Sequence, residues 1–292
     1  MITTIIFSKD RPLQLDLCLK SINKNLVGSD AITVTVIENY SEKYLGALET
    51  LQSEHPEVNF IKQHGSSLFK CIWAYLSTQR AHFPVVFFTD DGILFKEQDV
   101  RTICNVLEQT DCVTYSMRMG LNVVRREHQG MSYHDKICRS PSKSHMDQEN
   151  RVLHWDKTVQ NYGNYWSYSH SVDGHVFRWN DIFDWTDMLC TLSCHHKNLE
   201  AKTPNDYESA LQMFWCSTAP WMSSPLQSCY VNSPNNRVSD NFHENSSGDT
   251  YYCSPSETLS LYEEGKRIKL LNIPIPHIDC PHTEIDIMKG IQ

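Results

Sequence analysis

The first hundred residues alternate between short apolar runs and amphipathic stretches. Uninterrupted β-branched and aromatic residues predict strands, and apolar residues recurring at helical spacing predict helices. The predicted strands are 2–8, 32–37, 58–61 and 85–89, and the predicted helices are 13–22, a stretch with Tyr44, Leu48 and Leu51 on one stripe, and 68–76. Alternating strands and helices indicate an α/β fold with a parallel sheet, in which ligands bind outside the carboxyl ends of the strands.

One of these strand ends carries two adjacent carboxylates. The strand 85–89 runs directly into Asp90, Asp91 and Gly92. Successive side chains of a strand point to opposite faces, so one carboxylate is predicted to face a site while the other anchors the loop. Hard oxygen ligands in a short cluster suit Mg²⁺ or Mn²⁺ completed by substrate phosphates. The alternative interpretation is an ordinary Asp-Gly turn after a strand.

Other polar residues are predicted to share this edge of the sheet. Ser8 and Arg11 follow the first strand, and Glu38 closes the second. Because the carboxyl ends of parallel strands meet at one edge, we expect Ser8, Arg11, Glu38 and Asp91 to converge there.

These segments, in this order, resemble a nucleotide-sugar-dependent glycosyltransferase of the GT-A fold, close to the family-two type. The resemblance lies in the opening strand, the turn Phe7–Leu15 into a helix, Glu38, and the signature Thr89-Asp90-Asp91. The segments 115–122 and 166–178 also resemble acceptor-side parts of some sugar transferases. The resemblance covers residues 1–130 well and the remainder loosely. It implies a GT-A-like, mainly parallel sheet flanked by helices, with residues 1–125 as the donor-binding half. Residues 126–292 would form an elaborated acceptor-side half within one compact domain.

The resemblance also implies an activity and its cofactors. The protein would be a hexosyltransferase-like enzyme that moves a sugar from a nucleotide-diphosphate sugar, UDP-linked by preference, to a glycan, lipid-linked or protein acceptor. Asp91 would hold Mn²⁺ or Mg²⁺ at the diphosphate, and Asp90 would support it or touch the ribose. Ser8, Arg11 and Glu38 would lie beside the nucleotide. The cation neutralises the charge that develops on the leaving diphosphate.

An inverting transfer needs a carboxylate that takes the proton of the acceptor hydroxyl. We favour Glu208, which lies where family-two enzymes place an acidic pair at the start of an acceptor-side helix, with Asp206 and Asp173 as alternatives. Each of the three is equally open to interpretation as a solvated carboxylate or a turn or cap residue.

A histidine from the C-terminal part of the chain completes the metal site in many GT-A enzymes. His282 is the preferred candidate and His277 the second. The alternative for each is an ordinary hydrogen-bonding histidine.

Composition narrows the class of protein. The net charge of −9 argues against a nucleic-acid partner. No apolar stretch approaches the roughly 20 residues that cross a bilayer, and charged residues follow the first strand at once, unlike a signal peptide. We therefore expect a cytoplasmic protein without a transmembrane segment.

Two other classes remain open. A nucleotidyltransferase or another metal-dependent phosphate-cleaving enzyme would also place acidic residues at a strand end, although it would use a Gly-rich or basic phosphate loop. A noncatalytic carbohydrate-binding protein of the same fold would keep aromatic residues and lose the carboxylates. Trp155, Trp166 and Tyr168 are accordingly either a sugar-stacking platform or, more commonly for aromatic residues, part of the core.

Residues 232–256 are predicted to be irregular, and 257–265 to form a helix capped by Gly265.

Overall fold

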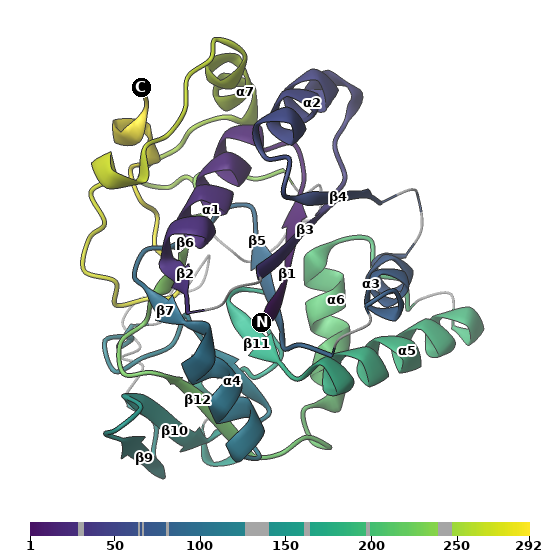
Figure 1. Cartoon of the computed structure of the whole chain (residues 1–292), viewed down its shortest axis with the longest axis vertical. Coiled ribbons are helices and arrows are strands. Elements are labelled where there is room, and N and C mark those ends of the chain that lie inside the picture. Colours follow the sequence, from purple (N-terminus) through teal and green to yellow (C-terminus); the bar gives the residue numbers. More distant parts are fainter. Residues whose placement is uncertain are drawn as a thin grey trace.

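A nine-stranded mixed sheet forms the centre of the protein (Figure 1). The computed structural model describes residues 1–28, 32–63, 65, 67–79, 82–125, 140–160, 164–196, 199–238 and 247–292, and the following account concerns these residues. Within them, the strand order is β4-β3-β1-β5-β11-β8-β12-β10-β9. In chain order the strands of this sheet are β1 (Ile2–Ser8), β3 (Ile32–Glu38), β4 (Asn59–Lys62), β5 (Val85–Thr89), β8 (Thr114–Ser116), β9 (Ser144–Asp147), β10 (Val152–Asp156), β11 (His175–Phe177) and β12 (Trp221–Pro225).

The first four strands of this order are mutually parallel, as the sequence predicts. Ser8 is opposite Glu38 in the β1–β3 pair, and Phe7 is opposite Thr89 in the β1–β5 pair. The carboxyl ends of β1, β3 and β5 are therefore level with one another. Beyond β5 the sheet changes character, because β11 runs antiparallel to both β5 and β8. The α/β prediction is confirmed.

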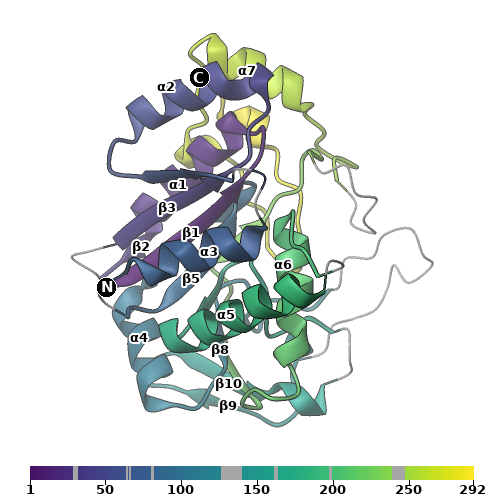
Figure 2. The same cartoon turned by 90° about the vertical axis from the view of Figure 1, so that its right-hand side faces the viewer.

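Helices cover both faces of the sheet. They are α1 (Pro12–Asn25), α2 (Leu45–Glu54), α3 (Leu68–Ser77), α4 (Val100–Gln109), α5 (Trp179–His195), α6 (Pro204–Leu211) and α7 (Pro255–Glu263). One core holds residues of α1, α2, α4 and α7, and a second holds residues of α3, α5 and α6, which lie together in Figure 2. Phe88 belongs to the first core and Phe87 to the second, since alternate strand residues face opposite sides. Within the described parts of the chain, none of the helices is both long and apolar enough to span a bilayer.

Two short strand pairs tie later segments to this frame. They are β2 (Leu26–Val27) with β7 (Gln98–Asp99), and β6 (Gly92–Leu94) with β13 (Tyr230–Asn232). The second pair is important for the site, because it places the segment after β13 beside the end of β5. The segment 232–256 was predicted to be irregular, and its described residues between 233 and 254 form no helix or strand, although Asn232 ends β13 and Pro255 begins α7. Gly265, with φ of +81°, follows α7, as predicted.

The tryptophan cluster belongs to the core. Trp155 and Trp166 have no exposed surface, and their rings meet edge to face with centroids 4.9 Å apart. Trp155 donates its indole N–H to the carbonyl of Trp166. The sugar-platform interpretation is therefore wrong for these two residues, because neither ring has a free face.

Candidate functional site

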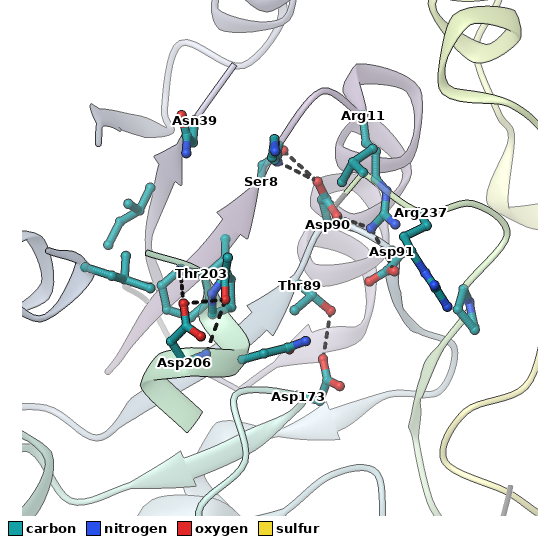
Figure 3. A pocket seen from close by; sticks show the side chains of 18 of the residues that line it. Ser8, Arg11, Asn39, Thr89, Asp90, Asp91, Asp173, Thr203, Asp206 and Arg237 are labelled. Atoms are coloured by element: carbon teal, nitrogen blue, oxygen red, sulfur yellow. Dashed lines mark hydrogen bonds and ion pairs between the residues drawn. The ribbon is translucent and has the colours of Figure 1, made fainter. Parts of the chain in front are cut away.

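A cavity of about 570 Å³ opens at the carboxyl ends of β1, β3 and β5 (Figure 3). Its volume falls within the usual range for small-molecule sites, and its position is the one expected for ligands of parallel sheets. The polar residues that line it include Ser8, Lys9, Arg11, Asn39, Gln63, Asp90, Asp91, Asp173, Asp206, Asn232, Asn236, Arg237 and His282.

The turn after β1 delivers Arg11 into the cavity. Asp10 has a φ of +53°, a left-handed conformation that aspartate tolerates better than most residues. Its carboxylate accepts hydrogen bonds from the backbone N–H and the hydroxyl of Ser41, which fixes this turn. Pro12 then occupies the first turn of α1, where its missing N–H costs nothing. Arg11 is thus held between a fixed turn and a helix start.

Arg11 joins the two carboxylates of the sequence signature. Its Nη1 lies 2.9 Å from Oδ1 of Asp90 and 2.8 Å from Oδ2 of Asp91. Asp90 accepts two further hydrogen bonds on Oδ2, from the hydroxyl of Ser8 and the backbone N–H of Lys9. Of the four residues expected to converge, Ser8, Arg11 and Asp91 meet here through Asp90, whereas Glu38 does not line the cavity.

The end of β13 and the residues that follow it close this cluster from a distant part of the chain. The side-chain amide of Asn232 donates to Oδ1 of Asp91 at 2.8 Å and to the hydroxyl of Thr89 at 2.9 Å. Asn236 accepts two hydrogen bonds from Arg11, from Nε on its side-chain oxygen and from Nη2 on its carbonyl. Asn236 is itself held by a hydrogen bond to the carbonyl of Cys253.

Burial and two adjacent charges together set the pKa of Asp90. Burial raises the pKa of Asp90, the Arg11 guanidinium opposes that rise, and the charge of Asp91 adds to it, with a net result of about 6. The charge of Asp90 therefore depends on the Arg11 guanidinium beside it.

Asp173 presents a carboxylate with two unlike oxygens. Oδ1 accepts from the hydroxyl of Thr89 at 2.7 Å and has the side chains of Asn232 and Tyr230 at 3.4 and 3.5 Å. For Oδ2, the nearest donors among the described residues are Arg118 Nη1 at 3.6 Å and His282 Nε2 at 3.9 Å. Hence Oδ2 has no close hydrogen-bond donor.

A glycine follows Asp173 for a conformational reason. Gly174 has a φ of +67°, and a Cβ at this position would lie 2.7 Å from the ring of Tyr230. The backbone can therefore turn here and direct Asp173 toward the cavity.

Arg118 supplies the positive charge behind Asp173. Its side chain is buried between two aromatic rings, with Cζ 5.6 Å from the ring centre of Tyr165 and 5.8 Å from that of Tyr168. Nη1 also lies 3.4 Å from Nε2 of His282. Burial lowers the pKa of His282, the charge of Asp173 opposes this, and the Arg118 charge adds to it, with a net lowering that keeps the imidazole neutral at pH 7.

Glu208 lies beside Asp173 but outside the cavity lining. Its Oε2 accepts the backbone N–H of Val172 at 3.1 Å. Burial raises the pKa of Glu208, and the charge of Asp173 adds to that rise. Glu208 therefore supports the backbone that carries Asp173, and of these two base candidates it is Asp173 that lines the cavity.

The remaining residues predicted from sequence differ in whether they line the cavity. Asp206 lines the cavity, but its carboxylate is taken up in a capping box with Thr203 at the start of α6. Glu38 is buried and outside the lining, because its Oε2 accepts the backbone N–H of Tyr40; Asn39 reaches the cavity instead. His277 is exposed and also outside the lining, whereas His282 is part of it.

Arg118, Asn232 and Asn236 were not singled out by the sequence reasoning. Arg118 lies in the segment 115–122 that carries part of the resemblance, and the two asparagines lie in a polar segment interpreted only as irregular. For the two asparagines, the sequence signal was the high density of asparagine beside Arg237. Loop segments rich in specific polar residues often carry binding or catalytic groups.

The donor chemistry of the cavity fits a hard divalent cation. Among the described lining residues, five carboxylates face four basic side chains, a net charge of −1; they are Asp90, Asp91, Asp173, Glu200 and Asp206 against Lys9, Arg11, Lys202 and Arg237. In the described parts of the chain, no group of three or more His, Cys, Asp or Glu side chains is placed to hold a metal. Such a site lacks an all-protein cage and suits an ion bound by one or two carboxylates together with substrate phosphates.

Comparison with known proteins gives similarity in structure and none in sequence. The sequence matches no protein-family model and none of the curated proteins. The similar solved structures include a mannosyltransferase and a glycosyltransferase. The mannosyltransferase PcManGT from Pyrobaculum calidifontis, in complex with GDP-Man and Mn²⁺, shares 15% identity over 39% of this chain and 34% of its own, with a TM-score of 0.32.

Two further structures cover more of this chain. TarS 1–349 from S. aureus, in complex with UDP, shares 10% identity over 78% of this chain and 59% of its own, with a TM-score of 0.46. The glycosyltransferase GlyE from Streptococcus pneumoniae TIGR4 shares 10% identity over 76% of this chain and 44% of its own, with a TM-score of 0.38. In each case the match spans less than two thirds of the other chain, and the likeness concerns the fold alone.

Proposed function

We propose that the protein transfers a sugar from a nucleotide-diphosphate sugar, UDP-linked, to an acceptor hydroxyl, with inversion and with the help of Mn²⁺ or Mg²⁺. The observation that carries the proposal is that one cavity contains both an adjacent pair of carboxylates and a separate single carboxylate. Asp90 and Asp91 stand at the end of β5, and Asn232 connects Asp91 to Asp173, whose Oδ2 has no close donor among the described residues. A site for a charged leaving group thus lies beside a candidate base.

The charge of the cavity supports the need for a cation. A lining with a net charge of −1 repels a diphosphate, which is itself negative. Asp91, with Asp90 beside it, would hold the cation, which supplies the positive charge that stabilises the departing diphosphate. Arg11 and Arg237 add fixed positive charge on the same side.

Asp173 is the base in this proposal. The acceptor hydroxyl gives its proton to Oδ2 of Asp173 while its oxygen bonds to the anomeric carbon. The bond from that carbon to the diphosphate oxygen breaks, and the nucleoside diphosphate leaves with the electron pair. Arg118 and the donors on Oδ1 keep the carboxylate oriented during this step. Glu208, the base favoured from sequence, acts behind Asp173 by fixing the backbone of Val172.

Calorimetric titration tests the donor site. UDP and GDP are titrated into the protein with Mn²⁺ and with a chelator, alongside Asp91→Asn and the control Asp187→Asn, which removes an exposed carboxylate of α5 outside the cavity lining. We expect Mn²⁺-dependent binding of UDP that is lost in Asp91→Asn and kept in the control. Failure of both nucleotides to bind under any condition would overturn the proposed function.

A further inference from the structure

Arg11 occupies the position that a cation shared by Asp90 and Asp91 would take. A single nitrogen, Nη1, lies within 3 Å of one oxygen of each carboxylate, at 2.9 and 2.8 Å. A metal ion that bridged the same two oxygens would sit where this nitrogen sits. The guanidinium and the cation therefore exclude each other at this point.

The rest of the guanidinium is anchored away from the carboxylates. Nε and Nη2 both donate to Asn236, which the carbonyl of Cys253 holds in place. Only Nη1 touches the carboxylates, so a small rotation about the Asn236 anchor releases them without freeing the whole side chain. Arg237 lines the same cavity.

The released Nη1 needs a new acceptor. Arg11 is nine-tenths buried, and a buried guanidinium N–H left without a partner is costly. Phosphate oxygens accept strongly from guanidinium groups, and a diphosphate entering this cavity would bring them next to Arg11. The displacement is thus unfavourable for a cation alone and becomes favourable when the diphosphate arrives with it.

We propose that Arg11 makes cation binding depend on the nucleotide, by closing the carboxylate pair of Asp90 and Asp91 until a diphosphate accepts its guanidinium. This inference rests on the proposed function, because it needs a nucleoside diphosphate as the ligand. It assigns to Arg11 a specific coupling role: the cation and the nucleotide bind as a pair, and each binds poorly alone.

Mn²⁺ affinity measured without turnover tests this coupling. Free Mn²⁺ is followed by electron paramagnetic resonance during titration of metal-free protein, with and without saturating UDP, or GDP if the calorimetry selects it. The variants are Arg11→Met and the control Arg101→Met, which removes an exposed guanidinium from α4. A thermal melt of each variant establishes that it is folded.

The expected result is tighter Mn²⁺ binding in Arg11→Met without nucleotide, by about 10-fold, because a repelling charge is removed from the carboxylates. Phosphate oxygens still contribute to Mn²⁺ binding in the variant, so UDP still increases the affinity, but by a factor about 5 to 10 times smaller than in the wild type. Arg101→Met should match the wild type in both measurements.

Unchanged or weaker Mn²⁺ binding in Arg11→Met, together with a wild-type effect of UDP, would overturn the inference while leaving the proposed function intact. If neither nucleotide binds the wild type, the proposed function and the inference fall together. Should Arg11→Met prove unfolded, Arg11→Lys decides the question. Lysine keeps the charge but cannot hold Asn236 and both carboxylates at once, so Mn²⁺ alone should bind it several-fold more tightly than the wild type; equal affinity counts against the inference.

Discussion

The two walls of the cavity treat their carboxylates in opposite ways. On the wall of β1 and β5, Asp90 accepts three hydrogen bonds, and Arg11 ties it to Asp91. On the other wall, the donors around Asp173 gather on Oδ1, and Oδ2 lies 3.6 Å from its nearest cationic nitrogen. A carboxylate surrounded by donors is fixed and suited to binding, whereas an oxygen without a close donor remains able to accept a proton. We call the side with Arg11, Asp90 and Asp91 the binding wall, and the side with Asp173 the proton-accepting wall.

The largest effect is expected from removing the acceptor of the proton. Asp173→Asn should lower the hydrolysis of a UDP-sugar by about 1,000-fold, since asparagine keeps the size and the Oδ1 contacts but cannot take a proton. Nucleotide affinity should stay unchanged, because the binding wall is untouched. Release of UDP gives kcat, and calorimetry gives the dissociation constant. If the rate falls less than about tenfold, a loss too small for a general base, the proton-accepting wall is wrongly assigned.

Arg11→Met tests the binding wall through stability. The substitution leaves two buried carboxylates without their shared cation and should lower the free energy of unfolding by about 3 kcal/mol. Urea unfolding in the presence of a chelator measures this loss. Saturating Mn²⁺ should restore more stability to the variant than it adds to the wild type, because the variant binds the ion more tightly. A loss below about 1 kcal/mol, the size of a surface ion pair, would mean that the two carboxylates do not depend on Arg11.

The pH dependence of the free energy of unfolding should include a contribution from Asp90. Burial, opposed by Arg11 and assisted by Asp91, raises the pKa of Asp90 from 3.8 to about 6, so the folded protein holds this proton more tightly than the unfolded chain. Stability from this group is complete below about pH 4 and is lost as the pH rises through about 6. Between pH 5 and 7.5 we expect a decrease of roughly 1 kcal/mol in the free energy of unfolding. Asp90→Asn should lack this component, and an identical pH dependence in the two proteins would contradict the assignment.

The smallest effect is expected at Glu208. Glu208→Gln keeps an oxygen that accepts the N–H of Val172, so the backbone that carries Asp173 should stay in place and kcat should fall less than about tenfold. The same hydrolysis assay measures it beside Asp173→Asn. If the two variants lose activity equally, the two carboxylates share the proton as a coupled pair; if Glu208→Gln loses more, the roles are reversed.

The part of the binding wall that is formed by residues adjacent in sequence could be predicted from the sequence. The apolar run 85–89 predicts a strand by itself, and Asp90 and Asp91 follow it directly, so the fold and the acidic pair emerge together. Glu38 shows the limit of this reasoning. It closes a strand as expected, but a hydrogen bond from the backbone of Tyr40 turns its carboxylate away, and Asn39 lines the cavity in its place.

The rest of the site depends on contacts that leave no local pattern. Asn232 meets Asp91 across 141 positions of sequence, and Asn236 meets Arg11 across 225. An asparagine in an irregular segment looks the same whether it faces solvent or a buried carboxylate. Arg118 could not be predicted from sequence either, because its burial between Tyr165 and Tyr168 follows from packing against the second half of the chain.

The segment that carries Asn232 and Asn236 also sets an order on the assembly of the site during synthesis. Arg11, Asp90 and Asp91 leave the ribosome long before these two asparagines, so the early chain has the arginine and the acidic pair but not yet the anchor of the arginine. Splitting the gene between the two halves should therefore give a first fragment that contains the whole acidic signature and binds no nucleotide until the second fragment is supplied. The site belongs to the pairing of both halves, although the sequence signature lies entirely in one.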